Sequence, residues 1–115
     1  MKISEILEIV HGDKLTPCND DFEIQYAFAS DLMSDALAMI HDHCESTILV
    51  TGLCNAQSIR TADMLDIRTI LIVRGKKYNE QEIELAKSCG IDVITTSYTM
   101  FETCGLLYKK GLKYV

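Results

Sequence analysis

The sequence predicts a three-layer α/β/α domain built around a mainly parallel sheet of about four to five strands. Three short apolar runs carry this prediction: "TILVTG" from Thr47, "TILIVRG" from Thr69 and "DVITTS" from Asp92. They begin 22 and 23 residues apart (69 − 47 and 92 − 69), which leaves room for a helix in each connection. Each run is nearly continuously apolar, as strands covered on both faces are. The order is therefore β-α-β-α-β-α, with right-handed crossovers.

Apolar residues at helical spacing fill the intervals between and after these runs. The predicted buried stripes are Ala56, Ile59, Ala62 and Leu65; Ile83, Ala86 and Cys89; and Phe101, Gly105 and Tyr108, with Cys104 beside them. Gly90 and Gly111 stand where a left-handed residue would end the second and third of these helices. Asn79 is the expected N-cap of the second, with Glu80 and Glu82 in its first turn.

Upstream of these runs, the chain predicts further elements of the same domain. "ISEILEIV" has the pattern of a short amphipathic helix, "DKLT" of a brief strand, and "EIQYAFAS" of a strand with alternating apolar residues Ile24, Tyr26 and Phe28. The next helix is expected to open at Ser30 and to bury Leu32, Met33, Ala36, Leu37 and Ile40. No linker or repeat interrupts residues 1–115, so we expect a single domain.

Charge and hydropathy exclude several classes of function. The net charge is −6, and the eleven basic residues are scattered apart from "RGKKY" and "YKKGLK". Because no continuous basic stripe is available to neutralise phosphates, nucleic-acid binding is not expected. Apolar runs such as "ILIV" are far shorter than the roughly 20 residues that span a bilayer. The N-terminus lacks the small-residue cleavage site of a signal peptide, so we expect a cytoplasmic protein without membrane contact.

The cysteines and histidines do not form a recognisable metal or disulfide pattern. The five cysteines include no C-x-x-C pair, which favours buried thiols over a disulfide framework or zinc ribbon. Cys54 lies near a helix start and is a candidate for a lowered pKa and a redox role. His41 and His43 are expected in a last helical turn, where side chains two residues apart point about 200° from each other. We therefore expect no metal and no cofactor.

Polar residues gather at the expected carboxyl ends of the strands. Ligands of open parallel sheets bind at these ends, where loops lead into helix N-termini. If the strand ending near Phe28 is parallel to the others, all four ends share one rim. The candidate ligand-binding residues on this rim are Ser30, Asp31, Ser34, Thr51, Gly52, Arg74, Gly75, Thr95 and Thr96. Hydroxyls dominate, and Arg74 is the one cation at a strand end, so the rim predicts a site for a small anion.

These residues also have purely structural explanations. Ser30 is a good N-cap, and carboxylates at Asp31 and Asp35 would complement the dipole of the helix that follows. In a helix, the repeat of "SD" after four residues aligns Ser30 with Ser34 and Asp31 with Asp35. Elsewhere on the rim, the structural alternatives are N-capping by Thr96 or Ser97 and solvation of Lys76 and Lys77 in a turn.

The whole pattern resembles that of the small stand-alone DRTGG-domain proteins. The similarity rests on "ISEILEIVHGDKL", "ASDLMSDALA", "ILVTG", "TILIVRGKKYNEQEIELAKSCGIDVITTSYTMFETCGLLY" and the chain length. It covers nearly the whole chain and is most specific at "SDLMSD" and at G-I-x-V-I-T-T followed by T-x-F-E.

The resemblance implies a non-catalytic module. The family is similar in fold to the N-terminal domain of HPr kinase/phosphorylase, and it occurs as a regulatory or dimerising part of CBS-regulated pyrophosphatases and long phosphate acetyltransferases. Stand-alone members are labelled serine kinases, but this chain has no P-loop. The family's Asp-Arg is replaced here by Leu53-Cys54, and of its Thr-Gly-Gly only Gly75 remains. If those residues bind a ligand elsewhere in the family, ligand binding here is altered or lost, and homodimerisation is the property that the resemblance implies more safely.

We therefore expect a regulatory or ligand-sensing homodimer that binds a nucleotide or phosphorylated metabolite, and not an enzyme. No grouping of nucleophile, base and orienting residue is recognisable in the sequence. Two alternatives stay open. One is a structural subunit that docks onto a redox or kinase partner, and the other is a small phosphoryl-transfer enzyme.

Overall fold

The computed structural model describes residues 1–115 and contains helices and short strands in alternation. In chain order the elements are α1 (Ile3–Val10), β1 (Asp13–Lys14), β2 (Tyr26–Ala29), α2 (Met33–Met39), the 3-10 turn η1 (Cys44–Ser46), β3 (Thr47–Thr51), α3 (Ala56–Met64), β4 (Thr69–Ile72), α4 (Glu80–Ser88), β5 (Asp92–Thr95), α5 (Met100–Lys109) and β6 (Lys113–Tyr114). None of the helices has the length and apolar character that a bilayer crossing requires.

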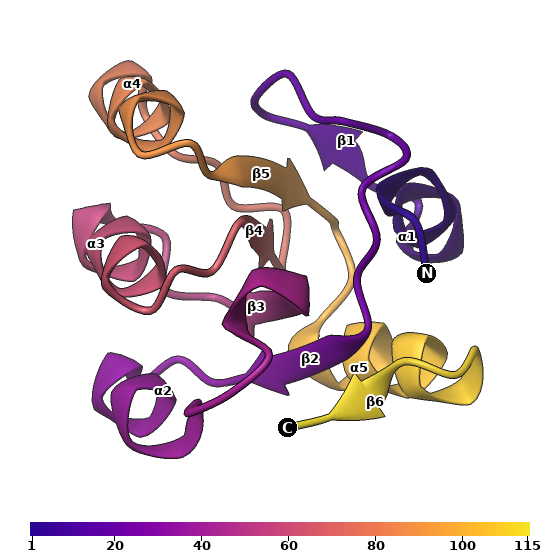
Figure 1. Ribbon diagram of the computed structural model, residues 1–115. Coiled ribbons are helices and arrows are strands. Elements are labelled where there is room, and N and C mark those ends of the chain that lie inside the picture. Colours follow the sequence, from indigo (N-terminus) through magenta and orange to yellow (C-terminus); the bar gives the residue numbers. More distant parts are fainter.

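The strands form one sheet between two layers of helices. Their spatial order is β1-β5-β4-β3-β2-β6, with β1 antiparallel to β5 and all other neighbours parallel. Helices α2, α3 and α4 cover one face, and α1 and α5 cover the other (Figure 1). The predicted three-layer fold is confirmed. The sheet has six strands because β1 and β6, of two residues each, extend its two edges.

Successive side chains of the central strands point to opposite faces of the sheet and form two separate hydrophobic cores. Leu49, Ile70 and Val93 pack in the core beneath α2, α3 and α4. Their sequence neighbours Ile48 and Ile94 pack on the other face, beneath α1 and α5. All of these side chains are fully buried, and each contributes roughly 1.5–3 kcal/mol through removal of apolar surface from water. Burial on both faces explains why these strands are continuously apolar in the sequence.

Several predicted helix boundaries are confirmed. Gly90 and Gly111, which follow the C-caps of α4 and α5, adopt φ values of +70° and +107°. Asn79 caps α4: its side chain accepts the Glu82 N–H at 2.8 Å, and the Glu82 carboxylate accepts the Asn79 N–H at 2.9 Å. These reciprocal bonds satisfy two main-chain donors that the helix leaves free.

The prediction that a helix opens at Ser30 is wrong. The main-chain N–H of Ser30 donates to Val50 O at 3.1 Å, which prolongs the β2–β3 ladder, and α2 begins only at Met33. Leu32 is the N-cap in an extended conformation and so lies outside the helix. Met33 and Ala36 are buried as expected, but Leu32 is 58 % exposed. Leu37 is exposed as well, so α2 leaves part of its apolar surface uncovered.

The stripe predicted to bury α5 is also wrong. Phe101 is 90 % exposed and Tyr108 66 % exposed, whereas Thr103 and Leu107 face the core. The helix carries two apolar stripes, and the buried one consists of Thr103 and Leu107, with Met100 and Cys104 packed against the same core. The N-cap of α5 is Thr99, which accepts the Glu102 N–H at 3.4 Å, and not Thr96 or Ser97.

The two histidines after α2 lie outside the helix, contrary to the prediction. Helix α2 ends at Met39, and His43 has a left-handed φ of +56°. The imidazole of His43 stacks on the ring of Tyr26 with centroids 4.6 Å apart. The chain between α2 and β3 is therefore held against β2 by an aromatic contact.

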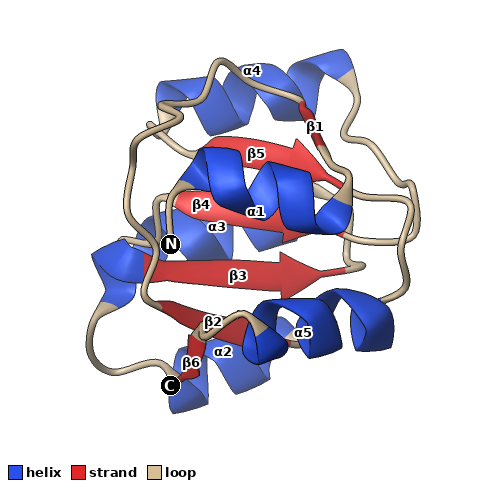
Figure 2. Ribbon diagram, turned by 90° about the vertical axis from the view of Figure 1, so that its right-hand side faces the viewer, coloured by secondary structure: helices blue, strands red, loops and turns tan.

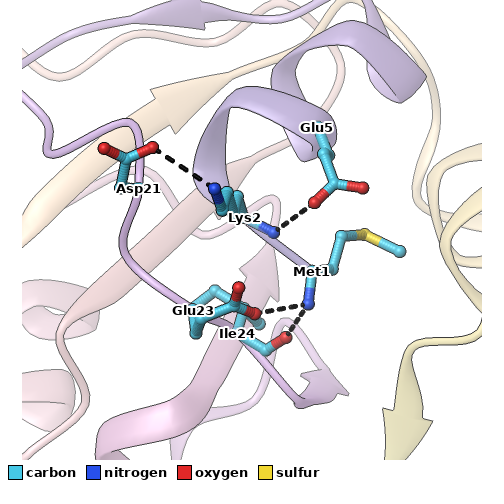
Figure 3. Close-up of polar contacts among 6 residues, drawn as sticks. All are labelled: Met1, Lys2, Glu5, Asp21, Glu23 and Ile24. Atoms are coloured by element: carbon cyan, nitrogen blue, oxygen red, sulfur yellow. Dashed lines mark hydrogen bonds and ion pairs between the residues drawn. The ribbon is translucent and has the colours of Figure 1, made fainter.

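Polar contacts at the start of α1 tie it to the segment before β2 (Figure 3). The ammonium group of Met1 donates to Glu23 Oε2 at 2.9 Å and to Ile24 O at 2.8 Å. The Lys2 N–H donates to Glu5 Oε1 at 3.0 Å, within the first turn of α1. The two Met1 bonds join the start of α1 to the segment before β2, whereas the Lys2–Glu5 bond stays within α1.

Candidate ligand-binding rim

The carboxyl ends of β2, β3, β4 and β5 lie at the same end of the sheet, as the arrowheads in Figure 2 show. Strand β2 is parallel to β3, with Phe28 paired to Leu49, so the condition for a shared rim is met. Asp31, Gly52 and Arg74 follow three adjacent strands and meet at these carboxyl ends. We call this end of the sheet the rim.

Gly52 lies at the centre of the rim. Its main-chain N–H donates to Asp31 Oδ1 at 2.6 Å, and the Thr51 hydroxyl donates to the same oxygen at 3.4 Å. A Cβ added at Gly52 would lie 2.6 Å from Arg74 Nη2 and 3.1 Å from Asp31 Oδ1. The absence of a side chain therefore lets a guanidinium group and a carboxylate approach the same stretch of backbone.

Lys76 supplies a second cation that the sequence analysis assigned to a solvated turn. Its ammonium group donates to Gly52 O at 3.0 Å. Arg74 is therefore not the only cation of the rim, and both cations lie against the Gly52 backbone. Lys77 is exposed and makes no side-chain hydrogen bond or ion pair, so the turn explanation holds for Lys77 alone. A lysine directly after Gly75 is the signal that could have found this contact.

The loop after β4 has an unusual backbone conformation. Arg74 and Gly75 have φ values of +66° and +69°. The Arg74 N–H donates to Tyr98 O and the Gly75 N–H donates to Thr96 O, each at 2.8 Å. A left-handed conformation at a non-glycine residue costs roughly 1–2 kcal/mol. Strain of this kind is concentrated at functional sites, where the surrounding structure holds it in place.

The hydroxyls of Thr95 and Thr96 both donate to main-chain carbonyl groups. Thr95 donates to Lys76 O at 2.8 Å, and Thr96 donates to Val10 O at 2.7 Å. Both residues are buried. The Thr95 hydroxyl thus fixes the loop that carries Arg74 and Lys76, whereas the Thr96 hydroxyl ties the segment after β5 to the end of α1. A direct part of either hydroxyl in ligand binding stays a prediction.

The two "SD" pairs at the other end of the rim have different environments. The Ser30 hydroxyl oxygen accepts the Leu32 N–H at 3.0 Å within a tight turn, so Ser30 does not cap α2. Asp31 binds Gly52, whereas Ser34 and Asp35 lie exposed in the first turn of α2. The four residues do not share one helical face, because Ser30 and Asp31 precede the helix.

A buried hydrogen bond between Tyr78 and Ser58 anchors the β4–α4 loop to α3. The two hydroxyl oxygens are 2.5 Å apart, and Ser58 Oγ also lies 2.8 Å from Asn55 O. Burial raises the pKa of Tyr78 far above its ordinary value. This anchor was not predicted, although Tyr78 is the one aromatic residue in the polar stretch "RGKKYNE".

The expectation of a lowered pKa at Cys54 is wrong. Partial burial raises the pKa of the Cys54 thiol, and the nearby carboxylate of Glu82 raises it further, against the smaller opposing effect of Lys76. Cys54 precedes the N-cap Asn55 and lies outside α3. The neutral thiol is favoured, which removes the chemical basis of the suggested redox role.

An apolar hollow lies on the face of the sheet that α5 covers, between α5 and the β2–β6 edge. Its volume is about 160 Å³, and it is lined by Ala27, Ala29, Val50, Cys104, Leu107, Tyr108, Leu112, Lys113 and Tyr114. The hollow has few polar groups with which to orient a charged ligand. The rim, by contrast, is an open surface on which Asp31, Arg74 and Lys76 are exposed.

The fold is similar to that of a solved structure. The crystal structure of the CBS and DRTGG domains of the regulatory region of Clostridium perfringens pyrophosphatase, in complex with its activator diadenosine tetraphosphate, matches with a TM-score of 0.69 over 92 % of the present chain. The present fold is DRTGG-domain-like. Sequence identity is 19 %, and the match covers 45 % of the pyrophosphatase chain, so the present chain spans about half of that length. No protein-family model and no curated protein matches the sequence.

Proposed function

We propose that this chain is a non-catalytic regulatory module, homodimeric, that senses a nucleotide or phosphorylated metabolite at the rim. The observation that carries the proposal is the position of two cations, Arg74 and Lys76, against the bare backbone of Gly52. The two groups differ in what they offer a phosphate. The guanidinium group of Arg74 provides a planar pair of N–H donors, and the ammonium group of Lys76 acts as a compact charge.

The acidic side of the rim gives the site polarity. Asp31 is engaged with Gly52, and Ser34 and Asp35 lie exposed one turn further along. Carboxylates repel phosphate groups but accept hydrogen bonds from ribose hydroxyls or an amine, and they also bind divalent cations. A ligand with phosphate at one end and hydroxyls or a metal ion at the other fits this arrangement.

A regulatory function is favoured over catalysis by the state of the candidate nucleophiles. The hydroxyls of Thr95 and Thr96 are buried and donate to main-chain carbonyls. The thiol of Cys54 has a raised pKa and is predominantly protonated at neutral pH. Each of these groups lacks the activation that nucleophilic catalysis requires.

The test is a melting-shift screen with ATP, AMP, diadenosine tetraphosphate and inorganic phosphate. The pyrophosphatase fragment of similar fold holds diadenosine tetraphosphate, which makes that nucleotide a sensible first probe. We expect at least one nucleotide to raise the melting temperature of the wild type and of Lys77→Ala, the matched control from the same loop. Arg74→Ala is expected to lose this shift. An equal shift in Arg74→Ala would contradict binding at the rim.

A turnover assay distinguishes a non-catalytic module from a phosphoryl-transfer enzyme. Purified protein is incubated with γ-labelled ATP and candidate acceptors. We expect no release or transfer of label above that of a buffer blank. Steady turnover that Asp31→Asn abolishes would refute the non-catalytic proposal.

A further inference from the structure

We propose that α5 is the surface through which two copies of this chain associate, with the two α5 helices antiparallel and a two-fold axis beside Gly105. The inference rests on the proposed homodimer and adds to it a specific interface. It follows from the exposed face of α5, whose side chains are complementary to themselves under such an axis.

Five residues make up the exposed face of α5. Because successive helical residues turn by about 100°, Phe101, Gly105 and Tyr108 fall within an arc of about 60°. Glu102 and Lys109 lie together on one flank of this arc. Phe101 and Tyr108, on the other flank, are 90 % and 66 % exposed. A Cβ at Gly105 would meet no atom within 4 Å, so nothing within the chain requires glycine there.

The order of these residues suits an antiparallel pair. A two-fold axis at the level of Gly105 keeps each flank on its own side and reverses the helix direction. Glu102 then faces Lys109 of the second copy, and Phe101 faces Tyr108 of the second copy. The residues of each pair differ in level by only about 1.5 Å, the rise of one helical residue. Two ion pairs and two aromatic pairs form around a central glycine, where the backbones can approach closely.

The apolar hollow beside α5 offers room for the exposed aromatic ring. Tyr108 lines this hollow, together with Leu107 and Leu112. Since Phe101 of the second copy lies opposite Tyr108, its ring is placed at the mouth of the hollow. A phenyl ring that is 90 % exposed in one copy thereby gains an apolar environment in the pair.

A second exposed apolar surface, on α2, is less suited to self-association. Leu32 and Met39 at the two ends of α2 are 58 % and 59 % exposed. Helix α2, with the sequence "MSDALAM", carries the carboxylate of Asp35 and no basic residue. A two-fold pairing of α2 helices would bring carboxylates together without a countercharge. Charge complementarity therefore selects α5.

Charge reversal tests the interface. We expect sedimentation equilibrium to show a dimer for the wild type at micromolar concentration. Glu102→Lys and Lys109→Glu each place like charges opposite one another, so each single variant should dissociate roughly tenfold more readily. The double variant Glu102→Lys/Lys109→Glu restores both ion pairs in reversed polarity, and its affinity should return towards that of the wild type. Circular dichroism of each variant checks that α5 remains folded.

The outcomes separate the interface from the homodimer itself. A monomeric wild type would overturn both the homodimer and the α5 pairing. A wild-type dimer with unchanged affinity in both single variants would overturn the α5 pairing and leave a homodimer formed through another surface. Weakened single variants without recovery in the double variant would overturn the antiparallel geometry. Phe101→Ser, with the charges intact, is expected to weaken the dimer as well, and an unaffected dimer would count against the aromatic contact.

Discussion

The carboxylate of Asp31 accepts the main-chain N–H of Gly52 at 2.6 Å and so joins the ends of two parallel strands, β2 and β3. The two residues are 21 positions apart in the chain. Strand adjacency brings them together, since the ladder continues from Phe28–Leu49 to Ala29–Val50. The carboxylate thus holds in place the backbone segment over which the two rim cations lie.

Replacement of Gly52 by alanine is expected to remove ligand binding at little cost in stability. The new Cβ would lie 2.6 Å from Arg74 Nη2, the far end of a flexible side chain that can move aside. Gly52 is buried, but the nearest atoms to the new Cβ belong to the side chains of Arg74 and Asp31, so we expect the free energy of unfolding to fall by only about 1 kcal/mol, near the average for point substitutions. The nucleotide-dependent melting shift should disappear. Denaturant unfolding and the melting-shift screen measure the two effects, and an undiminished shift would contradict the role of the guanidinium position.

Arg74→Gly separates stability from binding. The left-handed φ of +66° is costly for arginine and alanine and readily adopted by glycine. We therefore expect Arg74→Gly to be more stable than Arg74→Ala by about 1 kcal/mol, while both variants lose the nucleotide response. Chemical denaturation of the pair measures the difference. Equal stabilities would show that the left-handed backbone at this position is not strained.

Tyr78→Phe is expected to reduce the alkaline sensitivity of the protein. Burial raises the pKa of Tyr78 above its ordinary value of 10.0, so the native state keeps a proton that the unfolded state loses. The unfolded state then binds fewer protons, and stability falls as the pH rises through 10 and beyond. Urea unfolding from pH 8 to 11 on both proteins measures the effect. The cysteines titrate in the same range and are common to both, so only the difference between the two curves reports on Tyr78.

The same substitution has a smaller effect at neutral pH. Loss of the hydroxyl removes the hydrogen bond to Ser58, whose oxygen still lies 2.8 Å from Asn55 O. We expect a loss of about 1 kcal/mol, typical of one hydrogen bond whose partner stays satisfied. Curves of wild type and Tyr78→Phe that remain parallel up to pH 11 would contradict the raised pKa.

Local sequence patterns were sufficient for the strands and for several helix ends. Continuous apolar runs identify strands that are buried on both faces, and they need no knowledge of the partner strand. The stops at Gly90 and Gly111 and the cap at Asn79 are equally local, because the bonds that define them lie within a few residues. The meeting of Asp31, Gly52 and Arg74 also followed from the sequence, once parallel strands were assumed.

Features that depend on contacts distant in the chain were not accessible in this way. The start of α2 is delayed by the bond from Ser30 to Val50, which no local pattern reveals. Strand β6 has only two residues, Lys113–Tyr114, and exists because β2 pairs with it. For α5, two apolar stripes compete, and only the space over the sheet decides that Leu107 and not Phe101 is buried.

Gly105→Ala is expected to stabilise the monomer and weaken the dimer. Alanine is favoured over glycine in a helix interior by about 1 kcal/mol, and the added methyl group meets no atom within 4 Å. The melting temperature of the dilute protein should therefore rise by several degrees. In the proposed pair, however, the two methyl groups meet at the crossing point and force the helices apart. Because dimerisation stabilises by mass action, the gain should shrink as concentration increases.

Gln81→Ala provides the matched control for this experiment. Gln81 is exposed in α4, on the opposite face of the sheet, so the substitution changes helix propensity away from the proposed interface. Its effect on the melting temperature should not depend on concentration, and its dimer affinity should equal that of the wild type. If Gly105→Ala sediments as a dimer of unchanged affinity, the close approach of the two helices at Gly105 is wrong, even where charge reversal supports the Glu102–Lys109 pairing.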